Sequence, residues 1–164
     1  MSSGTVINVT NGSKARLTLS NVSLADAAPG SANGLDIPLI QDVTVTATPG
    51  TVRYSTLDSD ASSAFTTVNE NSVSLNILVD GETFFGNADL DTNSVSENGL
   101  FGTSKNKTEV FFSVAFEGTD SGARYITGKG FIGGLAPTAS VDQAVWITPM
   151  EIIVNGELAA LAIA

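Results

Sequence analysis

The chain has 164 residues, a length that fits one domain with a sizeable core, and we expect residues 1–164 to form that single domain. It carries 17 acidic and 7 basic residues, a formal net charge of −10, so no basic stripe is available to bind nucleic acid tightly. The absence of cysteine and histidine excludes disulfides, thiolate and imidazole metal ligands, and Ser-His-Asp or Cys-His catalysis, which makes an enzyme the least favoured class.

The first predicted element is a β-hairpin centred on Asn11-Gly12. These residues tolerate the positive φ angles of a type I′ turn, and they stand between the alternating runs "TVINV" and "ARLTL". The next segment, residues 25–38, collects Pro, Gly, Ser, Asn and Asp and is predicted to be a long loop. No basic segment followed by an apolar one opens the chain, and no apolar run approaches about 18 residues, so we expect a soluble protein with no membrane partner.

Alternation with a period of two dominates the rest of the chain. Residues 40–57 and 58–79 each contain a run that places Val, Leu or Ile against Thr, Ser or Asn, which predicts strands with one buried and one wet face. Residues 80–107 break this rhythm and are predicted to be a long insertion with one short α-helix near residues 95–104. Four more β-rich runs follow, so the predicted fold is mainly all-β, an antiparallel β-sandwich or partial barrel with long loops.

The chain ends in "LAALAIA", which is uncharged and apolar. Two interpretations of this tail remain open: a short helix or strand that packs on the domain's own core, and a segment that is buried against another subunit.

One motif points to a nucleotide. Residues 128–133, "GKGFIG", spell G-x-G-x-x-G, and Glu151 follows at the distance of a ribose-binding acid. A dinucleotide site also needs a helix that begins inside the motif, but Pro137 and the strand-like residues 146–148 follow instead. We therefore favour a strand whose glycines allow a bulge or the close approach of a neighbouring backbone, with no cofactor.

A second motif resembles a calcium loop. In residues 89–100, Asp89, Asp91 and Asn93 occupy its first, third and fifth places. Ser94 replaces the glycine of the sharp turn, and Leu100 replaces the glutamate that closes the coordination shell. A solvated loop is favoured, and weak cation binding at residues 89–100 stays open as an alternative.

A third candidate is the carboxylate pair Asp58 and Asp60. Paired carboxylates do acid–base chemistry only in a cleft that separates their pKa values, whereas serine-rich neighbours favour a turn in water. We therefore assign no catalytic, cofactor-binding or metal-binding residue, and we expect the protein not to be an enzyme.

The order of elements resembles the closing pattern of bacteriophage tail tube (major tail) proteins. The matching positions are Gly-x-Gly-Phe-Ile at residues 128–132, a small-residue segment at 136–142, a strand at 145–148, and a final strand and glycine turn at 154–158. The upstream residues 37–81 resemble the first long hairpin of that family. The resemblance covers most of residues 37–158.

This resemblance implies a virion structural protein of the tail, made in the host cytoplasm. Its subunits would form stacked hexameric rings that contact other tail proteins and let DNA pass without adhering. Six copies would carry a formal charge of about −60, which repels the phosphate backbone. The alternative is a β-sandwich binding module, such as a capsid decoration protein or a carbohydrate-binding adhesin.

The resemblance also implies which parts line the tube. Two long hairpins, near residues 43–79 and 123–148, are expected to face the lumen. Candidate lumen-facing residues at their ends are Asp58, Asp80 and Asp142. Candidates for contacts between rings are residues 80–107, the N-terminal segment and the apolar tail.

Overall fold

A computed structural model describes residues 15–29, 31, 33–37, 40–57, 61–87, 94–118, 120–139, 141–142 and 146–163. The strands in this part of the chain are β1 (Arg16–Ser20), β2 (Leu35–Ile37), β3 (Ile40–Tyr54), β4 (Ser63–Val79), β5 (Val110–Ala115), β6 (Arg124–Gly133), β7 (Trp146–Val154) and β8 (Ala159–Ala162). The helices are α1 (Gly81–Phe85) and α2 (Val95–Lys105). The predicted all-β class is confirmed, and the hairpin predicted at Asn11-Gly12 lies outside the described residues.

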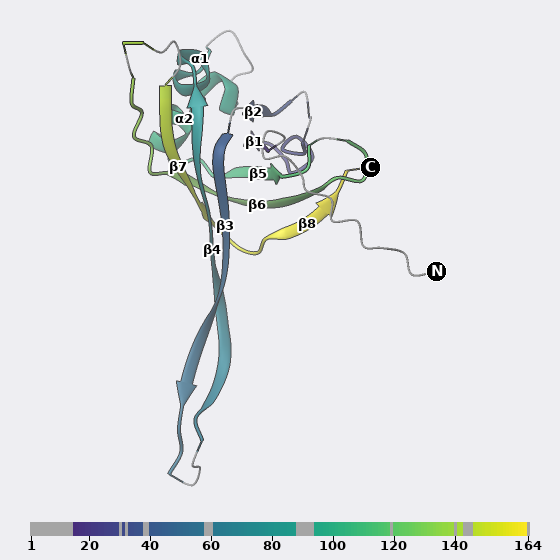
Figure 1. Ribbon diagram of the computed structural model, residues 1–164, viewed down its shortest axis with the longest axis vertical. Coiled ribbons are helices and arrows are strands. Elements are labelled where there is room, and N and C mark those ends of the chain that lie inside the picture. The colour runs from purple at the N-terminus through teal and green to yellow at the C-terminus, as the bar shows by residue number, and fades with distance from the viewer. Residues whose placement is uncertain are drawn as a thin grey trace.

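The strands pair antiparallel in the order β2-β1-β5-β6-β7-β4-β3, and β8 adds to β6. Strand β6 is the point at which the sheet turns. Its first residues pair with β5 and β8, and its last residues, 130–133, pair with β7. In Figure 1, β3, β4 and β7 therefore run along the long axis of the molecule, while β5, β6 and β8 run across it. The sheet folds over at β6 into two layers.

The core lies between these two layers. Residues 71–79 of β4 and the strand β7 contribute every second residue to it, because side chains alternate between the faces of a strand, whereas β1 and β5 are buried on both faces. The largest contributions come from β1, β5, β4 and β7, whose inward side chains are at most 2% exposed: Leu17, Leu19, Phe112, Val114, Val73, Leu75, Ile77, Met150 and Ile152. Burial of one such side chain contributes about 1.5–3 kcal/mol, so this double layer is the main source of stability.

The two helices cover one end of the sandwich (Figure 1). The helix predicted near residues 95–104 is confirmed as α2, whereas the five-residue α1 is too short to give a helical period and was not predicted. The backbone after α1 crosses that of α2 at Gly86 and Gly99, which have φ angles of 89° and 68°. A Cβ atom on Gly99 would overlap the backbone of Phe84 and Gly86, so only glycine permits this contact.

The predicted long loop at residues 25–38 is wrong at its end. Residues 35–37 form β2, a short edge strand beside β1. Residues 24–29 form turns as expected, and they fold over β5, where Ser113 donates its hydroxyl hydrogen bond to the carbonyl of Ala27. A strand of three residues carries too little alternation to be recognised in a segment rich in turn residues.

Strands β3 and β4 form a hairpin that is much longer than the body of the protein requires. At about 3.3 Å per residue, the 17 residues of β4 span about 56 Å, although β7 beside it has only 9 residues. The far part of the hairpin extends away from the sandwich, at the end opposite α1 and α2 (Figure 1). We call residues 51–57 and 61–66 the ribbon, and all of them are exposed. The hairpin predicted at residues 43–79 is confirmed.

The second predicted long hairpin, residues 123–148, is not formed. Strands β6 and β7 pair only through residues 130–133 and 151–154, and most of β7 pairs with β4 instead. The apolar tail forms the edge strand β8 beside β6, with all four residues exposed, which supports neither complete burial on its own core nor a helix.

Candidate functional site

The glycine motif at residues 128–133 belongs to a strand, as expected. Strand β6 runs through it, and no helix follows in residues 134–139 or 141–142. Gly128 lies under the ring of Phe112, and Gly130 faces the backbone of Ile153 in β7. Glu151 pairs across the sheet with Gly133 and does not lie over a helix N-terminus. The glycines therefore permit close packing where the sheet turns, and the dinucleotide interpretation is wrong.

The predicted lumen candidates fall at different places. Asp58 lies outside the described residues, as does Asp60. Asp80 follows β4 and caps helix α1, since its carboxylate accepts a hydrogen bond of 2.8 Å from the backbone N–H of Thr83. This bond and one from the Thr83 side chain hold the pKa of Asp80 below its usual value. Asp142 is an exposed turn residue before β7. Within the described chain, no hydrogen bond or ion pair joins Asp80 to Asp142.

The described part of the calcium-like segment, residues 94–100, has a structural role. Asp89, Asp91 and Asn93 lie outside the described residues. Ser94 caps α2 by accepting a 3.0 Å hydrogen bond from the backbone N–H of Glu97, and Leu100 is fully buried in the core. Across the described ranges, no group of three or more acidic, histidine or cysteine residues could hold a metal ion.

The most extensive candidate surface is the outer face of β3, β4 and β7. The alternation that sends Val73 and Leu75 into the core sends Ser72 and Ser74 outward, and β3 and β7 follow the same register. We call this surface the polar face. Its members are Asp42, Thr44, Thr46, Thr48, Glu70, Ser72, Ser74, Asn76, Pro149, Glu151 and Ile153.

The polar face is acidic. It carries the exposed carboxylates Asp42, Glu70 and Glu151, and residues 40–49, 69–79 and 146–154 contain no lysine or arginine. The amide of Asn76 donates to both oxygens of Asp42, at 3.1 and 2.9 Å, so this carboxylate is held in place on the sheet. A shallow groove of about 490 Å³ lies between Glu70 and Glu151. Hydroxyl, amide and carboxylate groups thus cover most of this face, and the pairing of β3, β4 and β7 sets their spacing.

Sequence reasoning missed these three carboxylates as a group. In the sequence, Asp42 and Glu70 belong to no recognisable site motif, and Glu151 matches only the position of a ribose-binding acid. The signal was present in the alternation, because Asp42 shares its face with Thr44, and Glu70 shares its face with Ser72. The alternation does not reveal that β4 pairs with β7. This pairing brings Glu151 beside Ser74.

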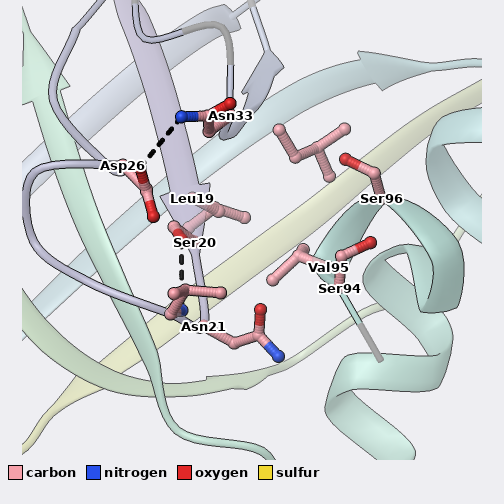
Figure 2. Close-up of a pocket in the computed structure, with 10 residues that line it drawn as sticks. Leu19, Ser20, Asn21, Asp26, Asn33, Ser94, Val95 and Ser96 are labelled. Atoms are coloured by element: carbon pink, nitrogen blue, oxygen red, sulfur yellow. Dashed lines mark hydrogen bonds between the residues drawn. The ribbon is translucent and has the colours of Figure 1, made fainter. Parts of the chain in front are cut away.

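A smaller cavity of about 230 Å³ lies between the loop after β1 and the start of α2 (Figure 2). Its polar groups bind one another: the Asn33 amide donates to Asp26 at 3.2 Å, and the Ser20 hydroxyl accepts from the backbone N–H of Val22 at 3.2 Å. Ser94, on its other wall, is occupied as the cap of α2. The side chains of Ser20, Asp26, Asn33 and Ser94 around this cavity are therefore engaged in local structural hydrogen bonds.

Three solved structures share this fold. The first is the tail of an empty gene transfer agent particle, refined with C6 symmetry, with a TM-score of 0.58 and 14% identity over 94% of this chain and all of that one. The second, the virion of the native gene transfer agent particle, gives 0.56 and 16% over the same shares. The third is the SPP1 tail tube, with a TM-score of 0.62 and 12% identity over 95% of this chain and 81% of that one.

No protein-family model matches the sequence, and no curated protein matches it. The likeness to the three structures therefore rests on architecture. It covers nearly the whole chain, and it confirms the predicted tail tube fold.

Proposed function

We propose that this protein is a structural subunit of a phage-type tail tube, in the tail of a virion, and that it acts by assembling with copies of itself. Its tail tube fold supports this proposal. The main support for it is the ribbon, the part of the hairpin whose side chains do not pack on the subunit's own core.

The ribbon is amphipathic and uncovered. Val52, Tyr54 and Phe65 lie on one face, because Val52 pairs with Phe65 and Tyr54 is two residues along the same strand. These side chains are 44%, 51% and 54% exposed, and Leu57 near the turn is fully exposed. A two-stranded hairpin alone is marginally stable in water, and an apolar face with a period of two is typical of a surface that becomes covered. A neighbouring subunit would supply the cover.

Closure of the subunits into a ring would give the open edges of the sheet a partner strand. Strand β3 ends the strand order on one side, so one long edge of it has no partner strand among the described residues. Exposed edges of this kind template uncontrolled pairing, and closed symmetric assembly removes them. One of the similar tails was refined with C6 symmetry, and we extend a sixfold ring to this chain as part of the proposal.

We assign the wall of the lumen to the polar face. Asp42, Glu70 and Glu151 would replace Asp58, Asp80 and Asp142 as the carboxylates that repel passing DNA. Asp80 is occupied as a helix cap, whereas the polar face presents its carboxylates on one face of paired strands. Repulsion between this face and the phosphates would keep DNA from adhering during passage.

Electron microscopy of the purified protein tests the proposal. We expect rings or tubes in negative stain, and sedimentation should show large species that grow with protein concentration. The proposal would be contradicted by a protein that is folded, with the β-sheet content of this structure, and yet stays monomeric at high concentration.

The lumen assignment makes a separate prediction. In the double variant Glu70→Lys and Glu151→Lys, the polar face holds two ammonium groups and one carboxylate, while the core is untouched. Tubes assembled in the presence of short linear duplex DNA should then retain DNA that nuclease cannot digest, and retention should fall steeply as salt rises.

A matched control changes the net charge by the same amount at another place on the surface. Asp120→Lys with Asp142→Lys replaces two exposed acidic residues in turns. DNA bound to this variant should remain open to nuclease. Equal protection in both double variants would argue against the polar face as the lumen wall.

A further inference from the structure

Three side chains with complementary chemistry meet beside Gly130. Glu109 precedes β5, Lys129 lies in β6, and Asn155 follows β7. Gly130 pairs with a residue of β5 and with a residue of β7, and each of the three side chains is one position away from this junction. A carboxylate, an amine and a primary amide from three parts of the chain are thus brought together, and the proposed tail tube function uses none of them.

The Glu109 carboxylate lies between the other two groups. Its Oε2 accepts a 2.7 Å hydrogen bond from Nδ2 of Asn155, and its Oε1 lies 3.9 Å from Nζ of Lys129. The backbone N–H of Asn155 donates a 2.8 Å hydrogen bond to the carbonyl of Lys129, so these two residues stand opposite each other. Side chains of opposite residues share a face, with Cβ atoms about 4.5–5.5 Å apart, and a lysine side chain spans that separation.

We infer that Lys129 and Asn155 become joined by an isopeptide bond within the subunit, and that Glu109 carries the proton. An uncharged lysine amine is a nucleophile. Its Nζ attacks Cγ of Asn155 and gives a proton to Glu109, and a new C–N bond forms. The bond between Cγ and Nδ2 then breaks as Glu109 returns the proton to the leaving nitrogen. One ammonia molecule is released, Glu109 ends as it began, and the step consumes no other reactant.

The placement of Glu109 fits this proton transfer. General acid–base transfer needs one group within reach of both the atom that attacks and the atom that leaves. The two oxygens of Glu109 face these two nitrogens separately. Half of the Lys129 side chain is exposed, so its amine exchanges protons with solvent, and only the uncharged fraction attacks. Alkaline pH raises that fraction and should therefore speed the reaction.

The bond would lock the place where the sheet turns. Strands β6 and β7 pair only through residues 130–133 and 151–154, and a link between positions 129 and 155 closes this short ladder at its end. Residues 130–154 would then lie within a covalent loop, which restricts the unfolded chain as a disulfide does. A chain without cysteine has no disulfide with which to obtain this effect.

Trypsin digestion with mass spectrometry tests the inference. No lysine or arginine follows Lys129, so trypsin should release residues 125–129 and 130–164 of the unlinked chain as separate peptides. After incubation of the whole protein at alkaline pH, the isopeptide bond should block cleavage at Lys129. The product is one peptide of residues 125–164, lighter by one ammonia molecule. Chymotrypsin, which cuts after Phe131 and Trp146, should leave the two linked fragments joined.

Gly156 offers a competing reaction at the same amide. Its backbone nitrogen can attack Cγ of Asn155 and form a succinimide, which also releases ammonia. The mass loss would then lie within residues 130–164, and trypsin would still cleave fully at Lys129. That result would overturn the inference, and so would an unchanged mass after prolonged incubation.

Conservative variants test each role. Lys129→Arg keeps the charge but removes the nucleophile, so the linked product should disappear. Glu109→Gln keeps the size of the side chain and should slow the linkage by about 100-fold or more. Lys105→Arg, at the end of α2, is the matched control and should link at the unaltered rate. Circular dichroism shows whether each variant is folded, so that a lost linkage reports chemistry.

The outcomes separate this inference from the proposed function. Linkage at an unchanged rate in Glu109→Gln would overturn the role of Glu109 as proton carrier. Tubes built from subunits that never link would overturn the isopeptide bond, while self-assembly stands. Because the reaction lies within one subunit, a linked monomer that forms no tube would support the bond and contradict the tail tube proposal.

Discussion

Replacement of Gly130 by valine is expected to destabilise the sandwich strongly. Gly130 pairs with Val110 of β5 and with Val154 of β7, so it sits where the sheet passes from one layer to the other. A Cβ atom at this position would overlap the carbonyl of Ile153 and lie 3.0 Å from the Cα of Val154. Both obstacles are backbone atoms, which cannot rotate away as a side chain does, and β7 would have to separate from β6.

The expected loss is about 3–5 kcal/mol of unfolding free energy, a large share of the 5–15 kcal/mol typical of a domain. Urea unfolding followed by circular dichroism measures it, and tube assembly should be lost as well. Gly133→Val is the matched control, because a Cβ atom there meets nothing within 4 Å. We expect its unfolding free energy to stay within about 0.5 kcal/mol of the unaltered value. Equal stability of the two variants would mean that the close approach at Gly130 is not what requires glycine.

Shortening the hairpin is expected to abolish tubes and leave the subunit folded. The variant replaces residues 50–68 by Asn-Gly, a turn that can join the paired residues Pro49 and Asn69. The ribbon residues 51–57 and 61–66, which make up most of the described part of this segment, contribute nothing to the core, so the thermal midpoint should stay within about 5 °C. Tubes should disappear because the apolar face of Val52, Tyr54 and Phe65 is then missing.

Negative-stain images and thermal unfolding of the same sample measure the two effects. A variant that keeps the full hairpin but carries Val22→Ser serves as control, since it removes an exposed apolar side chain outside the ribbon. Tubes of normal length from the shortened chain would show that the ribbon is dispensable, and assembly would then have to rest on the sheet edges alone.

Much of the fold could be predicted from local patterns. The alternation in residues 40–57 and 58–79 predicted β3 and β4 because side chains on a strand change face at every residue. The helix near residues 95–104 was visible as a break in that rhythm. Elements of three to five residues, such as β2 and α1, were missed because so few residues do not complete a recognisable period.

The candidate site was harder to predict. Asp80 and Asp142 were expected at the lumen because they lie near hairpin ends, yet Asp80 caps a helix that the sequence did not reveal. Asp42 and Glu70 are separated by 28 positions, and Glu151 by a further 81. Only the register of β3, β4 and β7 brings the three carboxylates onto one face.

Some features of this protein follow from local sequence patterns, and others depend on contacts between distant residues. Composition and the period of side chains along one strand are enough to predict the class of fold, the acidic character and the absence of histidine and cysteine chemistry. Tertiary structure alone decided that β6 joins both layers through Gly130, that the ribbon leaves the core, and that Phe85, Phe101 and Trp146 gather at the opposite end. Such features depend on contacts between residues far apart in the chain, which no local period records.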